Sequence, residues 1–323
     1  SVKMNGEEDA VQFKLPVHHP SPVRKEHVAH GASEASKTVS VKLPAHAMLS
    51  TAEVHISVDR DGLAGIEDGL RELVGYPYGC LEQTTSKVIP MIAVRGLAEG
   101  LNLDSLKGGK LDEYVKAGVA KIGKHQTSYG GFSLWPGGEP SAYYTAYALW
   151  GLYLADKAGY SVDKSRIEDG LNYLSYDGKR PNESEDYYDP SGNLGNQAFA
   201  LYVRAMLGRK DTQAATELLA EEDDMPVYGK AFLARALAAD LGKDDPAVVK
   251  LVKELTELAQ GAMKSNEPLI SEPGHDGLHY YMSSSMRTTA IVLDTLVALA
   301  PAKEVNAQIV DMLMKRRRVD RYL

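Results

Sequence analysis

The sequence is poor in cysteine, with a single one, Cys80, in 323 residues. One cysteine cannot form a disulfide within the chain, and a structural zinc site needs several cysteine or histidine ligands at short spacing, which the neighbourhood of Cys80 lacks. The thiol is left with three roles: an inert buried side chain, a nucleophile paired with a histidine, or an acylated group. All thiol chemistry of the chain must take place at this position.

Long apolar runs and an excess of basic residues are also missing. No apolar stretch approaches the length of a membrane-spanning helix, and 44% hydrophobic residues are typical of a globular protein large enough for more than one domain. The net charge of −8 argues against nucleic acid as a partner. The chain begins at Ser1 without a basic and then apolar leader, so we expect a removed signal peptide or, preferably, a piece of a larger protein.

Gln83 follows Cys80 by three residues. Positions i and i+3 share one face of a helical turn, so Sγ of Cys80 can meet the side-chain carbonyl carbon of Gln83. Attack of the thiolate on this carboxamide with loss of ammonia gives a γ-glutamyl thioester, which is a stored acyl donor. Gly79 allows a sharp bend and a close approach of the backbone. The run therefore predicts a rigid turn that feeds a helix beginning near Leu81.

Apolar and polar residues alternate within residues 36–58. The alternation predicts two half-buried antiparallel strands, broken at 44–50. The stretch before them contains three prolines, at positions 16, 20 and 22, and is expected to be irregular or edge-like. From Gly65 onward the pattern is helical.

The helical part alternates between two kinds of segment. Alanine-rich segments with aromatic residues start near Tyr144, Gln197, Tyr228 and Thr288, and more polar helices cover residues 165–174 and 247–262. Apolar inner helices that alternate with amphipathic outer helices predict an α/α toroid of helical hairpins. The fold class is therefore mainly α, preceded by a short β segment.

The run Gly-Cys-Leu-Glu-Gln, with Tyr-Pro-Tyr before it and Thr-Thr-Ser after it, resembles the thioester signature of the α2-macroglobulin and complement family, in its bacterial form. The resemblance implies a toroidal thioester domain inserted into a CUB-like β-sandwich domain. Residues 1–60 would be a β-rich segment of the CUB-like domain, and residues 61–323 the toroid. We expect the toroid to be truncated at its C-terminal end, because the family continues there with further helices.

The resemblance also implies a function. Proteins of this kind are broad-spectrum protease inhibitors that act once and are not enzymes: after cleavage of a bait region, the thioester between Cys80 and Gln83 captures lysine amines of the attacking protease. No cofactor and no metal are expected. The implied location is the periplasm, within a larger inner-membrane lipoprotein of bacterial defence. The implied partners are attacking proteases, other domains of the same chain and a periplasmic cell-wall synthase.

A thioester persists only where water is excluded, so bulky neighbours must shield it. Tyr76 and Tyr78 are the local candidates, although Tyr78 fits an ordinary core position equally well. Glu82 lies between the two cross-linked residues and is assigned to positioning. Asn196 falls, by rough placement, where complement members that prefer hydroxyl acceptors carry a histidine. The resemblance therefore implies amine acceptors, while a helix N-cap is the other interpretation of Asn196.

Two other functions stay open. A cysteine–histidine hydrolase or acyltransferase requires a histidine within reach of the thiol, and His125 is the nearest one after Cys80. A toroid that only binds a partner would leave Cys80 and Gln83 unexplained. Substitution of Gln83 separates these functions from the thioester.

One further cluster has the residue types of a metal site. His275 and His279 are four residues apart, next to Glu272 and Asp276, which would suit a metal ion on a helix. Two glycines within this segment favour a loop instead. We therefore predict no metal site there.

Overall fold

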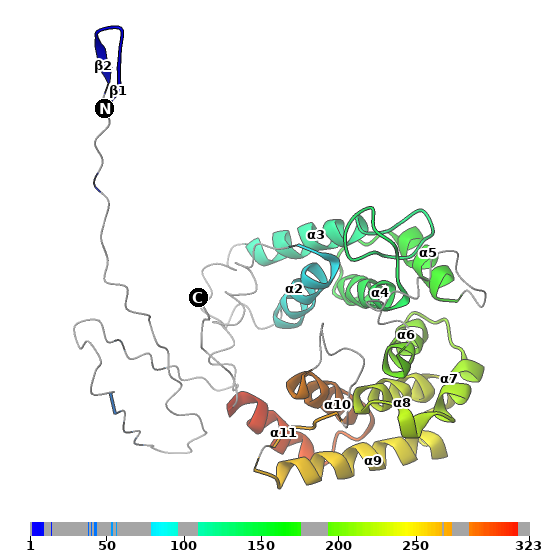
Figure 1. Cartoon of the computed structure of the whole chain (residues 1–323). Coiled ribbons are helices and arrows are strands. Elements are labelled where there is room, and N and C mark those ends of the chain that lie inside the picture. The colour runs from blue at the N-terminus through cyan, green and yellow to red at the C-terminus, as the bar shows by residue number, and fades with distance from the viewer. Residues whose placement is uncertain are drawn as a thin grey trace. The chain divides into compact units, whose positions relative to one another are not determined.

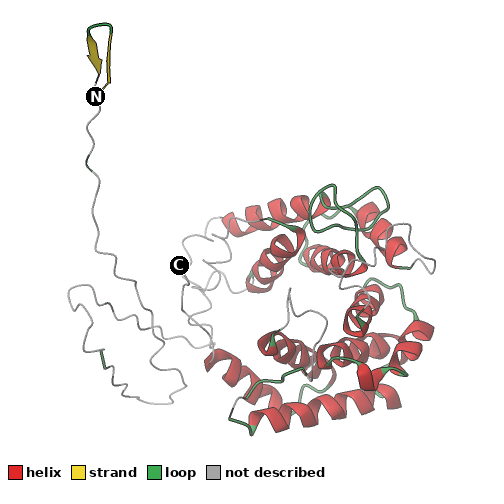
Figure 2. Cartoon of the chain, in the orientation of Figure 1, coloured by secondary structure: helices red, strands yellow, loops and turns green. Residues whose placement is uncertain are grey.

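A computed structural model describes residues 2–9, 79–95, 109–175, 193–266, 268–272 and 284–315, together with the single residues 14, 38, 40, 42, 43, 53 and 56. The chain divides into two compact units. One is His46–Arg317, called the helical unit below, and the other joins Ser1–Ala45 with Arg318–Leu323. Helices dominate the described part of the helical unit (Figure 2).

The described helices of the helical unit form an inner and an outer row (Figure 1). The inner row consists of α2 (Leu81–Val94), α4 (Ala142–Lys157), α6 (Leu194–Met206), α8 (Val227–Leu241) and α10 (Ser285–Leu299). The outer row consists of α3 (Lys110–Gly123), α5 (Lys164–Leu174), α7 (Thr212–Leu219), α9 (Pro246–Met263) and α11 (Glu304–Lys315), with a 3₁₀ turn at Glu222–Asp224. The predicted toroid of helical hairpins is confirmed.

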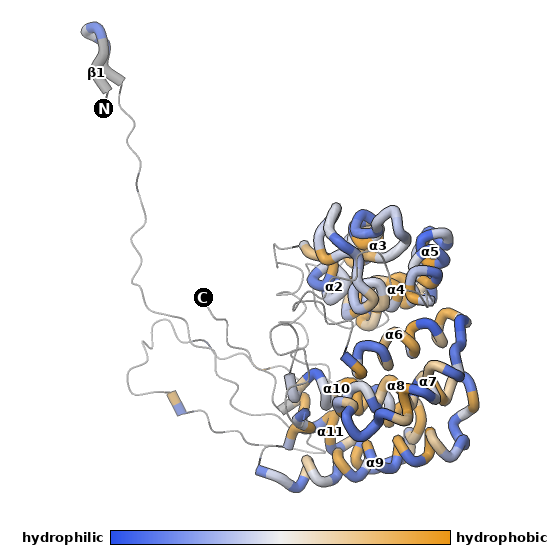
Figure 3. The backbone as a smooth tube through the Cα atoms, turned by 45° about the vertical axis from the view of Figure 1, so that its right-hand side comes forward, coloured by the Kyte–Doolittle hydropathy of each residue, from blue (hydrophilic) through white to orange (hydrophobic). Residues whose placement is uncertain are grey.

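The two rows differ in how many of their faces are buried. The inner helix α4 buries alanine and leucine side chains on several sides, among them Ala146, Ala148 and Leu149. The outer helix α9 buries only one stripe, which includes Val248 and Leu251, at helical spacing. Figure 3 shows the result as blue and orange segments that alternate along α9. The sequence contrast between apolar and polar helices therefore determines which row a helix joins.

Glycines let neighbouring inner helices approach each other closely. A Cβ added at Gly229 of α8 would lie 2.6 Å from the Cα of Gly195 in α6, and one added at Gly151 of α4 would lie 2.8 Å from Thr85 of α2. Real Cβ atoms essentially never come so close. These contacts set the spacing of α2 from α4 and of α6 from α8.

Most helices begin with a side chain that caps them. Ser141, Asp163, Asn193, Asp211, Asp245 and Ser284 each accept a hydrogen bond from a backbone N–H of the first turn. Helix α8 follows Pro226, which has no capping side chain. Its first N–H groups instead donate to Glu272, at 2.6 Å from Val227 and 3.1 Å from Tyr228. A residue 45 positions further along the chain thus caps α8.

A short β-hairpin lies near the start of the chain. Strands β1 (Val2–Met4) and β2 (Glu7–Asp9) pair antiparallel, with Met4 opposite Glu7. Asn5 and Gly6 form the turn with φ of 54° and 86°, as two-residue hairpin turns require. The Asn-Gly pair is a hairpin signal in the sequence. The proline-containing stretch that was expected to be irregular or edge-like lies outside the described residues and stays a prediction.

The strands predicted within residues 36–58 lie almost wholly outside the described residues. The few positions described there belong to no strand, and Ile56 is 83% exposed. The predicted boundary between residues 60 and 61 also lies outside, so both remain predictions. None of the described helices is long and apolar enough to cross a membrane.

Candidate functional site

Cys80 is the N-cap of α2 and is in contact with Gln83. The Gln83 backbone N–H donates to Sγ of Cys80 at 3.5 Å, and the Cys80 N–H donates to Oε1 of Gln83 at 3.4 Å. This reciprocal pair is a capping box in which sulfur takes the place of the usual hydroxyl oxygen. The predicted helix start at Leu81 is confirmed. The contact brings the thiol and the carboxamide to the same side of the first turn.

The Cys80 side chain is buried, and its surroundings raise the pKa of the thiol. Cys80 is 6% exposed, and the next residue, Leu81, is fully buried and donates its N–H to the carbonyl of Leu134 at 3.0 Å. Burial raises the pKa of the Cys80 thiol, the hydrogen bond from the Gln83 backbone lowers it, and the negative charge of Glu82 raises it further. The net effect is upward. The site therefore favours the protonated thiol, unlike the thiolate of a cysteine–histidine pair.

Gly79 provides room for a side chain of the neighbouring helix. A Cβ at this position would overlap the Nζ atom of Lys121, which comes from α3. The close approach that we expected at Gly79 is present, and it brings a lysine beside the residue that precedes Cys80. The expected sharp bend stays a prediction.

Glu82 has a hydrogen-bonded partner one turn further along α2. Ser86 Oγ donates to Oε1 of Glu82 at 2.8 Å and lies 2.8 Å from the hydroxyl of Tyr147 in α4. Burial raises the pKa of Tyr147, while its hydrogen bond to Ser86 lowers it. The three side chains form a continuous polar chain from α4 to the first turn of α2. Of these three residues, only Glu82 was predicted as a site residue from the sequence, although the i, i+4 spacing of Ser86 from Glu82 indicates their contact.

The first turns of the inner helices meet around this chain. Tyr143 in α4 is buried, which raises its pKa; the charge of Arg287 in α10 opposes the rise and that of Glu82 adds to it. The guanidinium of Arg287 also lies 4.6 Å from the ring centroid of Tyr228 in α8. Charged and phenolic groups from α2, α4, α8 and α10 therefore share one region.

Asn196 lies in the first turn of α6, and its side chain is 2% exposed. The hydroxyl of Tyr228 lies 3.3 Å from Oδ1 of Asn196 and 2.8 Å from Oδ1 of Asn193, so the two side chains share its single proton as acceptors. The interpretation of Asn196 as an N-cap is wrong, because Asn193 caps α6 by accepting from the N–H of Gly195 at 2.8 Å. Asn193 comes three residues before Asn196 in the sequence, so Asn196 lies inside the first turn of α6 and not at its N-cap. The role of Asn196 in acceptor preference stays a prediction.

The His125 side chain contacts the backbone of Ser133. It is 1% exposed, its Nδ1 lies 3.2 Å from the carbonyl of Ser133, and burial lowers its pKa. No hydrogen bond in the described part of the chain joins it to Cys80. The described contacts of His125 therefore give no support to a cysteine–histidine pair with Cys80.

Several predicted residues lie outside the described part of the chain. These are Tyr76, Tyr78, His275, Asp276 and His279. Glu272, the fourth member of the histidine cluster, is described and caps α8. Among the described residues, no group of three or more histidine, cysteine or acidic side chains is arranged to hold a metal ion.

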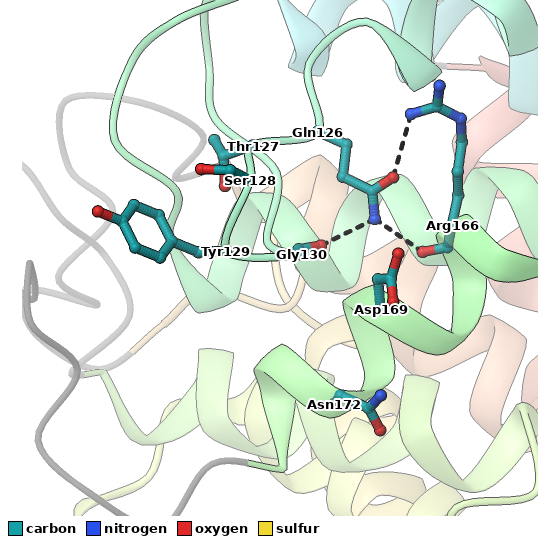
Figure 4. Close-up of a pocket in the computed structure, with 8 residues that line it drawn as sticks. All are labelled: Gln126, Thr127, Ser128, Tyr129, Gly130, Arg166, Asp169 and Asn172. Carbon is teal, nitrogen blue, oxygen red and sulfur yellow. Dashed lines mark hydrogen bonds between the residues drawn. The ribbon is translucent and has the colours of Figure 1, made fainter.

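A separate open pocket lies between α5 and the loop that follows α3 (Figure 4). At its centre the Gln126 amide donates to the carbonyls of Gly130 and Arg166, both at 2.9 Å. Arg166 Nη1 in turn donates to Gln126 Oε1 at 3.1 Å. These groups satisfy one another, and the lining shares no residue with the first turn of α2. The candidate site therefore remains at Cys80.

The family comparison points to the same segment. Residues 46–190 match the model described as A-macroglobulin TED domain. The chain is 36% identical over 109 residues to α2-macroglobulin of Thermotoga maritima, which covers 34% of this chain and 7% of that protein. It is 37% identical over 151 residues to α2-macroglobulin of Escherichia coli, which covers 44% of this chain and 9% of that protein. The chain spans only a small part of these relatives.

Solved structures agree in fold. A native E. coli α2-macroglobulin fragment, from domain MG7 to the C-terminus, matches with a TM-score of 0.63 and 24% identity over 80% of this chain and 39% of that one. E. coli α2-macroglobulin activated by porcine elastase matches with a TM-score of 0.58 and 25% identity over 77% of this chain and 22% of that one. The helical unit therefore has the same arrangement of helices as these proteins.

Proposed function

Because the chain is a thioester-domain segment of the α2-macroglobulin family, we propose that Cys80 and Gln83 form an internal thioester that captures attacking proteases. The observation that carries the proposal is the reciprocal contact of the two residues at the start of α2. The full trapping activity belongs to the longer protein of which this chain would be one part.

Formation of the bond follows from the contact. The Cys80 sulfur attacks the side-chain carbonyl carbon of Gln83, a C–S bond forms, the C–N bond of the carboxamide breaks, and ammonia leaves with the thiol proton. Negative charge develops on Oε1 of Gln83, which already accepts the Cys80 N–H at 3.4 Å. That N–H lies at the positive end of the α2 dipole. Donors placed where charge develops lower the barrier to attack.

Capture reverses the same chemistry with another amine. The nitrogen of a lysine on the protease attacks the thioester carbon, an amide bond forms, the C–S bond breaks, and the thiol of Cys80 is released. Each site reacts once, so the protein is an inhibitor and not a turnover enzyme. Burial of Cys80 supports this proposal, because water must be kept from the bond until it is used.

The choice of proteases as partners is supported by relatives. The E. coli relative is described as activated by porcine elastase. We also propose that Asn196 stands at the position where a histidine would favour hydroxyl acceptors, and that lysine amines are the preferred acceptors. We also propose that the domain acts in the periplasm as part of a longer, inner-membrane-anchored chain.

A cross-linking experiment tests the proposal. The chain is incubated with trypsin and, separately, with trypsin whose lysines have been reductively dimethylated and cannot be acylated. We expect a covalent adduct that resists denaturation and reduction only with unmodified trypsin. The Gln83→Ala variant should form none. An adduct of equal yield with Gln83→Ala or with dimethylated trypsin would contradict capture through Gln83.

A further inference from the structure

Lys121 of α3 brings an amine to the start of α2. Its Nζ atom occupies the space that a side chain at Gly79 would fill, because a Cβ added there would overlap it. Gly79 immediately precedes Cys80, and the N–H of Cys80 donates to Oε1 of Gln83 at 3.4 Å. One peptide bond and one hydrogen bond therefore separate the contact at Gly79 from the carboxamide of Gln83.

The close crossing of α2 and α3 keeps this amine near the site. A Cβ added at Gly118, one turn before Lys121, would overlap Cγ2 of Val88, so the two helices lie in contact. The positive charge of Lys121 also contributes to lowering the pKa of Lys87, after the burial of that residue. Lys87 lies one turn after Gln83 on the same side of α2. The amine of Lys121 therefore contacts the residue before Cys80 and is within electrostatic range of the turn after Gln83.

The Lys121 side chain is free to move toward Gln83. It is exposed, and among the described residues it has no hydrogen-bonding or ion-pair partner. Its amine stands on a flexible four-carbon stem. Reacting groups that are held next to each other in one molecule behave as if they were at very high concentration. An amine in this position therefore competes well with amines that arrive from solution.

Lys87 carries the other amine near Gln83, and the direction of the Gln83 side chain decides between the two. In the capping box this side chain reaches back to the N–H of Cys80. Its carbonyl carbon therefore lies toward the end of α2 that Lys121 contacts. Lys87 is one turn further along the helix, on the side from which the carboxamide turns away.

We propose that Lys121 is an internal acceptor of the thioester, so that an unused thioester ends as an isopeptide bond between Lys121 and Gln83. The inference rests on the proposed function. The unprotonated Nζ attacks the Gln83 carbonyl carbon, a C–N bond forms, and the C–S bond breaks. The Cys80 sulfur takes up the proton that the nitrogen loses. No atom enters or leaves, so the product has the mass of the thioester form and one free thiol.

The test follows the freshly prepared chain as it ages without added amine. Hydrolysis of the thioester adds one water, whereas the internal transfer leaves the mass unchanged, and both release one thiol. We expect thiol release without a change of mass, loss of methylamine uptake in the same fraction of chains, and a tryptic peptide pair joined through Lys121 and Gln83. In Lys121→Arg, which keeps the positive charge but removes the amine, the mass-neutral release should be at least about tenfold slower.

Lys124→Arg is the matched control, because Lys124 is an exposed lysine at the C-cap of the same helix. It should age like the unsubstituted chain. If Lys121→Arg forms no thioester, the position of the link in the unsubstituted chain decides the test. A link at Lys87, thiol release only with the gain of one water, or equal mass-neutral release in Lys121→Arg would overturn the proposal for Lys121 alone. An unsubstituted chain that never loses ammonia would overturn the proposed function itself.

Discussion

At the scale of single residues, the burial of Cys80 has consequences for its titration. Its pKa is raised first by burial. In the folded chain with a free thiol, such as Gln83→Ala, alkylation by iodoacetamide should be slower at pH 8 than in the urea-unfolded chain. Its rate should also keep rising at pH values where the unfolded thiol, with a pKa of about 8.5, has levelled off. Rates measured from pH 7 to pH 10.5 check this.

The same shift links stability to pH. The folded pKa is above the unfolded one, so the folded chain binds the thiol proton more tightly. The contribution to stability is complete below the unfolded pKa and is lost as the pH rises through the folded pKa. A folded thiol that titrates below the unfolded one would instead support the cysteine–histidine hydrolase.

Sequence and structure agree at Cys80 and Gln83 because their interaction is local. Their spacing of three residues is enough to predict a shared helix turn. Tyr147 is 61 residues away from Ser86, and only the packing of α4 against α2 brings them together. The contact between Arg287 and Tyr228 likewise depends on the order of helices in the row. Contacts between residues so far apart in the sequence cannot be predicted from local spacing.

At the scale of elements, α8 is capped by Glu272, a residue distant in the sequence. The Glu272 carboxylate accepts two N–H groups of α8 and the hydroxyl of Thr288 at 2.7 Å. Glu272→Ala should lower the free energy of unfolding by about 1–3 kcal/mol, because these donors lose their charged acceptor. Urea denaturation measures the loss.

The control for this change is Glu257→Ala. Glu257 is exposed on α9, 3.9 Å from Lys253, and its removal should change stability by no more than about 0.5 kcal/mol. Equal losses in the two variants would mean that Glu272 does not act as a cap.

The close crossing of α6 and α8 gives a second prediction at this scale. Gly229→Ala puts a methyl group against the backbone of Gly195, which cannot move aside as a side chain can. We expect a loss of about 1–3 kcal/mol from the separation of the two helices. Gly261→Ala in α9 is the control, because a Cβ there meets nothing within 4 Å and should stabilise by up to about 1 kcal/mol. A stabilising effect at both positions would refute the close crossing.

The positions of α2, α4, α5, α6, α8, α9 and α10 could be predicted from sequence, because alanine-rich and amphipathic segments differ clearly in pattern. The positions of α3, α7 and α11 were not predicted. The Asn5-Gly6 hairpin was also readable and was missed. The capping of α8 was not readable, since Pro226 offers no cap and Glu272 lies on a distant segment. Local signals therefore define where helices begin, and packing decides what completes them.

At the scale of the helical unit, aromatic side chains connect the inner helices. Phe199 of α6 is 3% exposed, and its ring centroid lies 6.4 Å from that of Tyr147, 5.7 Å from that of Trp150 and 4.8 Å from that of Phe232. Phe199→Ala should lower the free energy of unfolding by about 3–5 kcal/mol because it leaves a cavity among three helices. Circular dichroism during urea denaturation checks this.

Tyr129→Ala serves as the comparison, since Tyr129 is 59% exposed and should matter by less than about 0.5 kcal/mol. If Phe199→Ala were as stable as Tyr129→Ala, the aromatic cluster would not hold the inner row together.

The most direct measurement for the whole molecule is its intact mass and free-thiol content, before and after methylamine. The account predicts a chain one ammonia lighter than its sequence, with no free thiol, which then gains one methylamine and one thiol at Cys80. A chain of unreduced mass with Cys80 freely titratable from the start, and no methylamine adduct, would contradict it.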